Sequence, residues 1–260
     1  MIELKPPSSG ERAPHSTPEL ERVREHRSQV YAEGSVRMVS GERREIFPGA
    51  VREWAGQWLR DTIIREGAER TIETGFGLGI TALFMIEGTI EAAQLRGCPE
   101  GAGHTAVDPD QRCGFDCAGL LNIEGAGVGA RLELIEEDSM LALPQLIGSG
   151  RQFDLAFVDG EQSFEASLAD TVFMLRLVRP GGLVVIDDQS LAPVRSATDF
   201  VIKNLGVGVE TPETPSAAQR FAVLRRPERS VPRSCQRFVP FWAGQGETPP
   251  VPAASTLSAA

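Results

Sequence analysis

The feature that most constrains this chain is a glycine-rich turn, TIETGFGLGIT, which begins at Thr71 and joins a short apolar run to a helix-like segment. After Glu73, glycine occupies every second position, at Gly75, Gly77 and Gly79. Glycine lets the backbone bend sharply from a strand into a helix and lets a ligand lie against bare main chain. Ile80 stands where the dinucleotide-binding fingerprint requires its last glycine. The turn therefore predicts a different ligand site, in which Glu73 accepts hydrogen bonds from a cationic or hydroxyl-bearing group.

Strands and helices are expected to alternate from residue 68 onward. Strands are predicted at 70–73, 104–108, 132–135, 153–159 and 183–187, helices at 80–95, 112–124, 139–148, 164–177 and 194–204, and two final strands at 207–210 and 221–225. This alternation predicts an α/β fold with a parallel sheet, helices on both faces and ligands at the carboxyl ends of the strands.

Four segments are expected along the chain. Residues 1–18 are rich in Pro, Ser, Gly and Glu and are predicted to be disordered. Residues 19–67 are predicted to form a helical cap, with helices at 19–33 and 50–66 and a loop at 34–41 that covers a pocket. Residues 68–226 are predicted to form the ligand-binding domain. Residues 227–260 form a Pro-, Ser- and Ala-rich tail, in which 238–242 (FVPFW) is a candidate lid or homodimer contact.

Composition excludes several classes of protein. The formal net charge of −10 argues against a nucleic-acid-binding surface, since a polyphosphate would be repelled. Arg22, Arg24 and Arg27 form a candidate basic patch, but a solvated helix face is the favoured interpretation. The four cysteines fit neither a zinc site nor a disulfide framework. Neither a signal pattern nor an apolar run of membrane-spanning length is found, so a cytoplasmic protein without a membrane partner is expected.

Acidic residues follow the predicted strands. Asp108 closes the second strand, where a carboxylate suits the two ribose hydroxyls of a nucleoside, although a helix cap is the alternative. Asp138 and Ser139 follow the third strand, where an adenine ring would lie. The same residues can also cap the N-terminus of the helix that follows. Three further carboxylates converge after the fourth and fifth strands and require a cation, a ligand or a proton to relieve their repulsion: Asp159, Asp187 and Asp188.

With these residues in place, the chain resembles the class I S-adenosylmethionine (SAM) methyltransferases. It is most similar to the small-molecule O-methyltransferases related to catechol and caffeoyl-CoA O-methyltransferases, including a bacterial branch with an Asp-Gly-x-His motif. The shared segments are 73–79 (ETGFGLG), 106–109 (AVDP), 138–139 (DS) with 143–146 (LPQL), 157–160 (FVDG) and 179–188 (RPGGLVVIDD).

The resemblance implies a Rossmann-like fold with a seven-stranded, mostly parallel sheet whose last strand is antiparallel, and an N-terminal helical cap. It implies SAM as cofactor, with the methionine part at the glycine turn, the ribose at Asp108 and the adenine at Ser139. The cofactor-binding residues predicted in this way are Glu73, Gly75, Phe76, Gly77, Gly79, Asp108, Pro109, Asp138, Ser139 and Asp159. It also implies a magnesium site at Asp159, Asp187 and Asp188, with Asp188 in place of the asparagine of metal-dependent relatives.

One departure from the family pattern concerns the general base. The relatives carry a lysine or histidine three positions after the strand-four aspartate, where this chain has Gln162. Glutamine does not accept a proton near neutral pH. The predicted catalytic residues are therefore Asp159, Gln162 and Asp187. Three alternatives replace the missing base: another side chain (Glu161, His26 or Tyr31), a metal ion that lowers the pKa of the acceptor by itself, or an acceptor that needs no base.

The sequence therefore predicts a SAM-dependent methyltransferase that acts on a small molecule, at a hydroxyl oxygen, in bacterial secondary metabolism. Three alternatives stay open. An N-methyltransferase needs neither a metal nor a strong base. A non-catalytic subunit with the SAM fold is compatible with Gln162. A nucleotide-binding oxidoreductase is disfavoured by Ile80 and by the three aspartates.

Overall fold

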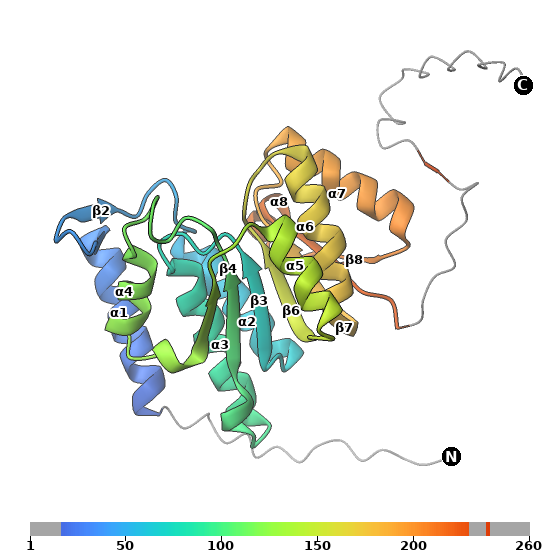
Figure 1. Ribbon diagram of the computed structural model, residues 1–260. Coiled ribbons are helices and arrows are strands. Elements are labelled where there is room, and N and C mark those ends of the chain that lie inside the picture. The colour runs from blue at the N-terminus through green and yellow to red at the C-terminus, as the bar shows by residue number, and fades with distance from the viewer. Residues whose placement is uncertain (1–16, 229–237, 240–260) are drawn as a thin grey trace, which may run out of the picture.

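The computed structural model describes residues 17–228 and 238–239. Its centre is a seven-stranded sheet with the order β5-β4-β3-β6-β7-β9-β8 (Figure 1). The strands are β3 (Arg70–Thr74), β4 (Gly103–Val107), β5 (Leu132–Ile135), β6 (Phe153–Val158), β7 (Val178–Ile186), β8 (Gly208–Glu210) and β9 (Ala222–Arg225). β9 is antiparallel to both of its neighbours, and the pairs from β5 to β7 are parallel. The predicted α/β fold and its antiparallel last strand are confirmed.

Helices cover both faces of the sheet (Figure 1). Side chains alternate between the faces along each strand, so Leu155 and Phe157 of β6 enter one core while Ala156 and Val158 enter the other. The first core is shared with α2 and α3, and the second with α5, α6 and α7. The helices are α1 (Pro18–Glu33), α2 (Glu53–Glu66), α3 (Ile80–Leu95), α4 (Ala118–Gly125), α5 (Ser139–Gly148), α6 (Phe164–Leu177), α7 (Ala192–Leu205) and α8 (Pro215–Arg220). Two short 3-10 helices lie at Pro99–Gly101 and Gly129–Arg131.

Two local predictions are wrong. The segment 34–41, expected as a loop, contains β1 (Ser35–Arg37), which pairs with β2 (Arg43–Glu45) as an antiparallel hairpin. The helix expected from residue 112 begins only at Ala118, because Asp116 and Cys117 have φ angles of 46° and 56°. A right-handed helix does not pass through such left-handed residues.

The arginines of α1 are not a solvated face. Arg27 is 8% exposed and pairs with Glu87 of α3. Arg24 also binds Glu87, at 2.6 Å, and Glu91, at 2.9 Å. Arg22 alone of the three stays exposed. The favoured interpretation of this patch is therefore wrong for Arg24 and Arg27, whose charges tie α1 to α3.

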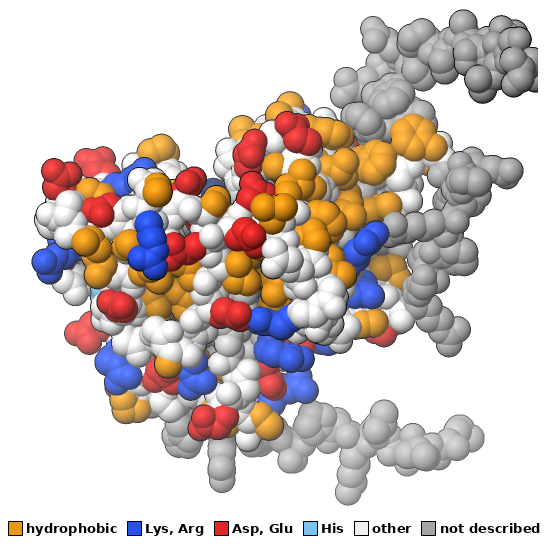
Figure 2. Space-filling view, in the orientation of Figure 1, with side chains coloured by type: hydrophobic (Ala, Val, Ile, Leu, Met, Phe, Trp, Pro, Cys, Tyr) orange, Lys and Arg blue, Asp and Glu red, His pale blue; other side chains and the backbone are white. Residues whose placement is uncertain are grey.

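The surface agrees with an acidic chain. On the face drawn in Figure 2, Lys and Arg side chains are interspersed with Asp and Glu, and hydrophobic side chains gather over α5, α6 and α7. Met140 and Leu141 of α5 are among the exposed large hydrophobic residues. Within the described segments, no helix has both the length and the apolar character needed to cross a membrane.

The two ends of the chain lie mostly outside the described residues. The predicted disorder of residues 1–18 falls on undescribed residues except for the last two, of which Pro18 begins α1. Of the aromatic segment 238–242, the structure describes Phe238 and Val239, which contact Phe200 and Asn204 of α7. Its role in a lid or a homodimer stays a prediction.

Candidate cofactor and acceptor site

The glycine turn follows β3 and meets the end of β6. Gly75 has a φ of +86°, and a Cβ on it would lie 2.1 Å from the carbonyl oxygen of Asp159. Gly79 has a φ of +71° and is the N-cap residue of α3. Side chains are therefore excluded here by both backbone conformation and space. Phe76, also predicted at the cofactor, is 3% exposed and packs in the core beneath the turn.

Glu73 is a buried carboxylate directly before this turn. It has no exposed surface, and its Oε1 lies 3.1 Å from Nε2 of His104 on β4. The contact misses hydrogen-bond geometry, so neither oxygen of Glu73 has a hydrogen-bond partner among the described residues. Burial raises the pKa of Glu73, and His104 opposes that shift. Because an unpartnered buried carboxylate is costly, this site fits a ligand with a cationic group, such as the ammonium group of SAM.

Asp108 is bonded to the glycine turn and not to a helix. Its Oδ2 accepts a hydrogen bond from the backbone N–H of Gly77 at 2.7 Å, and its Oδ1 accepts one from Asp110 at 2.8 Å. The alternative of a helix cap is wrong, since α4 begins ten residues later at Ala118. Each carboxylate oxygen keeps acceptor capacity for a further donor, such as a ribose hydroxyl. Pro109 is exposed beside it.

Asp138 and Ser139 begin α5. Asp138 is the N-cap residue and accepts a hydrogen bond from the backbone of Met140 at 2.7 Å, so its capping role is confirmed. Asp170 of α6 is 1% exposed, and this burial raises its pKa against the opposing effects of Ser139 and Thr74. Asp170 is not among the residues predicted from the sequence, although an acidic residue on the buried face of helix 164–177 is a usable signal.

The three aspartates follow the paired ends of β6 and β7, where Val158 lies opposite Ile186. Asp187 and Asp188 are the largest causes, after burial, of a raised pKa at Asp159. Burial also raises the pKa of Asp187 to about 6, against the opposing effect of Arg220. Asp187 is 1% exposed and accepts a hydrogen bond from Arg220 at 2.5 Å and one from its neighbour's backbone N–H at 2.7 Å. Asp188 has a φ of 54°.

This arrangement does not fit the predicted magnesium site. Oδ2 of Asp187 faces the guanidinium of Arg220, and Oδ2 of Asp188 accepts a hydrogen bond from Gln162. Among the described residues, no group of three or more histidine, cysteine, aspartate or glutamate side chains is arranged to hold a metal ion. The physical reason is that a cation of the chain itself, Arg220, already pairs with Asp187. Arg220 is not among the residues predicted from the sequence.

The substitute bases are differently placed. The hydroxyl of Tyr31 donates to the carbonyl of Val51 at 2.7 Å, and burial raises its pKa, so it does not serve as a base. His26 Nε2 lies 2.7 Å from Oδ1 of Asn122, whose amide N–H₂ group donates to Leu78. This pairing makes Nε2 of His26 the protonated nitrogen. Glu161 and Gln162 are exposed.

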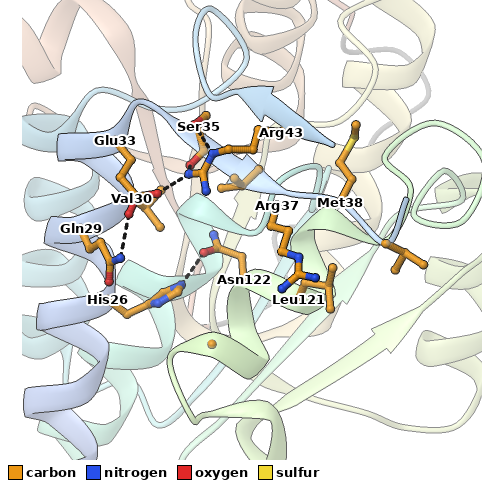
Figure 3. Close-up of a pocket in the computed structure, with 13 residues that line it drawn as sticks. His26, Gln29, Val30, Glu33, Ser35, Arg37, Met38, Arg43, Leu121 and Asn122 are labelled. Carbon is orange, nitrogen blue, oxygen red and sulfur yellow. Dashed lines mark hydrogen bonds and ion pairs between the residues drawn. The ribbon is translucent and has the colours of Figure 1, made fainter. Parts of the chain in front are cut away.

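His26 instead lines a cavity of about 580 Å³ between α1, the β1–β2 hairpin and α4 (Figure 3). In Figure 3, His26 and Asn122 point toward each other from α1 and α4, and Arg43 reaches back from the hairpin toward Glu33 and Ser35. None of the predicted cofactor-binding residues lines this cavity. It is therefore separate from the glycine turn and the aspartate cluster.

The raised pKa of Asp187 gives a pH dependence of stability. Because its folded pKa of about 6 exceeds the ordinary value of an aspartate, the folded chain binds more protons than the unfolded chain between about pH 4 and pH 6. The free energy of unfolding of the native chain, relative to Asp187→Asn, should therefore fall by about 1–3 kcal/mol as the pH rises through this window, and level off above it. Urea denaturation at intervals from pH 4 to 8 measures this difference. A difference that rises with pH would contradict the burial of Asp187.

Comparisons with known proteins relate the central part of the chain to methyltransferases. Residues 72–189 match a family model described as a methyltransferase domain. This segment is similar to methyltransferase domains. Caffeoyl-CoA O-methyltransferase 2 of Zea mays is 32% identical over 141 residues, which are 51% of this chain and 47% of that protein. The chain spans about half the length of the curated relatives it matches.

Solved structures of methyltransferases share the fold. A methyltransferase of Podospora anserina bound to S-adenosylhomocysteine has a TM-score of 0.59 at 17% identity and covers 87% of this chain and 99% of its own. The O-methyltransferase TomG of Streptomyces achromogenes, solved with SAM, has a TM-score of 0.55 at 19% identity, with coverages of 82% and 91%. The Rossmann-like fold of SAM-dependent methyltransferases is thereby confirmed. The roles of the individual site residues stay predictions.

Proposed function

We propose that this chain is a SAM-dependent methyltransferase that transfers a methyl group to a hydroxyl oxygen of a small molecule. The observation that carries the proposal is the fully buried carboxylate of Glu73, directly before a glycine turn that excludes side chains; among the described residues it has no hydrogen-bond partner, and its ion-pair contact is with His104. The methyltransferase family match and the names of the relatives support the reaction class and the oxygen acceptor.

Each cofactor-binding residue has a role in this proposal. Glu73 binds the ammonium group of SAM, and the bare main chain of the glycine turn borders its methionine part. Asp108, fixed by two backbone N–H groups, accepts hydrogen bonds from the ribose hydroxyls. Asp138 and Ser139 border the adenine at the start of α5. SAM supplies an electrophilic methyl group on a positively charged sulfur.

The acceptor lies on the side of the aspartate cluster. There α2 of the N-terminal cap brings Trp58 onto Phe221, with ring centroids 4.8 Å apart and an angle of 19° between the planes. These rings form an apolar wall beside Arg220 and Asp187. Alignment of the acceptor with the methyl group and exclusion of water supply much of the rate in such a site. The cap then determines which acceptors enter.

SAM binding is tested by replacing Asp108. Asp108→Ala removes the charge-assisted hydrogen bonds to the ribose and should weaken SAM binding by about 1.5–3 kcal/mol. Isothermal titration calorimetry with SAM and S-adenosylhomocysteine measures the affinity. Asp110→Ala is the matched control, because Asp110 is exposed and bonds to Asp108 through its backbone only. Native protein that binds neither compound would contradict the proposal.

Turnover separates the remaining alternatives. With methyl-labelled SAM and a panel of hydroxyl and amine acceptors, we expect the label on oxygen. Label on nitrogen would favour the N-methyltransferase, for which the absence of a strong base at Gln162 is the supporting observation. SAM binding without labelling of any acceptor that binds the protein would favour a non-catalytic subunit.

A further inference from the structure

Arg220 is the last residue of α8, and Phe221 separates it from β9. Its guanidinium donates a hydrogen bond to Oδ2 of Asp187 at 2.5 Å, and its side chain is 25% exposed. The charges of Asp187, Asp159 and Asp188 all act on Arg220, in that order of size. One guanidinium therefore pairs directly with Asp187 and acts through its charge on Asp159 and Asp188, the three carboxylates that the family resemblance assigns to a divalent cation.

The position of Arg220 is fixed by its surroundings. Its backbone carbonyl accepts a hydrogen bond from the N–H of Gln189 at 3.0 Å, which ties the end of α8 to the residues after β7. The guanidinium carbon lies 5.7 Å from the centroid of the Phe221 ring. Phe221 in turn is stacked on Trp58. A charged group held between an ion pair and an aromatic ring is preorganised, and does not need to move into place when a ligand binds.

The chemistry of arginine suits this position. A guanidinium stays protonated at all physiological pH values and has several N–H donors in a rigid plane. Nε of Arg220 is buried and has no hydrogen-bond partner among the described residues. A quarter of the side chain is exposed, and this exposed part, not the buried Nε, is what a ligand oxygen can reach.

We propose that Arg220 is the fixed cation of the acceptor site, in place of a divalent metal ion, and that it donates a hydrogen bond to the acceptor oxygen. This inference rests on the proposed methyl transfer for the role of the acceptor, but its charge arrangement can be tested without turnover. A metal ion holds an acceptor by direct coordination, whereas a guanidinium holds it by hydrogen bonds. The methyl-accepting substrate therefore needs only one hydroxyl group, whose oxygen accepts the hydrogen bond from Arg220. It does not need two neighbouring hydroxyls that chelate a metal ion.

The transfer step balances without a metal ion. A lone pair of the acceptor oxygen forms the new bond to the methyl carbon. The electron pair of the broken carbon–sulfur bond stays on the sulfur, which becomes the neutral thioether of S-adenosylhomocysteine. The hydroxyl proton leaves to solvent.

The first test uses the native protein. After dialysis against EDTA, titration with Mg²⁺ and with Mn²⁺ in the calorimeter should show no binding at the cluster, and neither ion should raise the melting temperature. Turnover should be unchanged in excess EDTA. Stoichiometric binding of either ion to the native protein with a Kd below about 1 mM, or loss of turnover in EDTA, would overturn the inference.

The second test removes the guanidinium. Arg220→Ala leaves the three carboxylates without their cation, so this variant should bind Mn²⁺ or Mg²⁺ and gain melting temperature from it, while its turnover in EDTA falls roughly 100-fold or more. Arg220→Lys keeps the charge and should stay unresponsive to both ions. Arg179→Ala is the matched control, because it breaks another arginine–aspartate pair, with Asp154 at 2.8 Å, at the other end of β7.

The outcomes separate this inference from the proposed function. Loss of SAM binding in the native protein would contradict the proposed function, but would leave the metal titrations unaffected. The role of Arg220 would be overturned if folded Arg220→Ala, like Arg179→Ala, binds neither Mg²⁺ nor Mn²⁺ and the two variants have equal turnover in EDTA. The proposed function would still stand in that case, provided that the native protein binds SAM. If Arg220→Ala does not fold, the native titrations and Arg220→Lys still decide the question.

Discussion

Replacing Gly75 by alanine is expected to abolish SAM binding and to lower the free energy of unfolding by about 2–5 kcal/mol. Part of this loss, about 1–2 kcal/mol, comes from placing a side chain on a residue with a φ of +86°. The rest comes from the new Cβ, which would lie 2.1 Å from the carbonyl oxygen of Asp159 and 2.6 Å from its carbonyl carbon. Because both obstacles are backbone atoms, either the turn or the end of β6 must move, as in other overpacked sites. Urea denaturation and calorimetry with SAM measure the two effects.

Gly150 supplies the matched control. It has a similar φ of +76°, but a Cβ there would meet nothing within 4 Å. Gly150→Ala should therefore show only the conformational part of the loss, about 1–2 kcal/mol, and unchanged SAM affinity. If the two variants lose equal stability and both bind SAM like the native protein, the close approach of the glycine turn to Asp159 has no functional importance.

The fold was predictable from the sequence because its signals are local. Short apolar strands alternate with helical segments, and this pattern leaves a parallel sheet as the natural arrangement. The glycine turn was also predictable, since its conformation depends on residues next to one another. The late start of α4 was not, because the left-handed conformations of Asp116 and Cys117 follow from tertiary contacts, such as the hydrogen bond from Ser40 to Asp116.

The identity of the cation at the aspartate cluster needed the structure. Arg220 and Asp187 are 33 residues apart, and they meet only because β9 returns antiparallel to β7 and brings the end of α8 with it. The sequence predicted that the three carboxylates require a cation, a ligand or a proton, and the family resemblance offered a magnesium ion. A signal for α8 itself was present, since Thr214 followed by Pro215 is typical of a helix start. What no local pattern supplied was the direction of the last side chain of that helix.

The two N-terminal helices, α1 and α2, are tied to α3 by a buried ionic cluster at Glu87. This side chain of α3 is 1% exposed and pairs with Arg24 and Arg27 of α1 and with Arg60 of α2, whose Nε lies 2.8 Å from Oε1. The side chains of Arg27 and Arg60 are themselves largely buried. Removing one partner of such a cluster leaves buried charge of the other sign without compensation.

Glu87→Gln is therefore expected to lower the free energy of unfolding by about 3–5 kcal/mol, although it keeps the size and shape of the side chain. Glu133→Gln is the control, because Glu133 also pairs with an arginine, Arg151, but its side chain is 50% exposed. The exposed pair should contribute about 0–1 kcal/mol. Urea denaturation of both variants gives the comparison, and hydrogen exchange of α1 and α2 shows where the loss acts. We expect faster exchange in both helices for Glu87→Gln alone. If the two variants lose equal stability, α1 and α2 are attached to α3 by apolar contacts, and the arginines of α1 have no structural role.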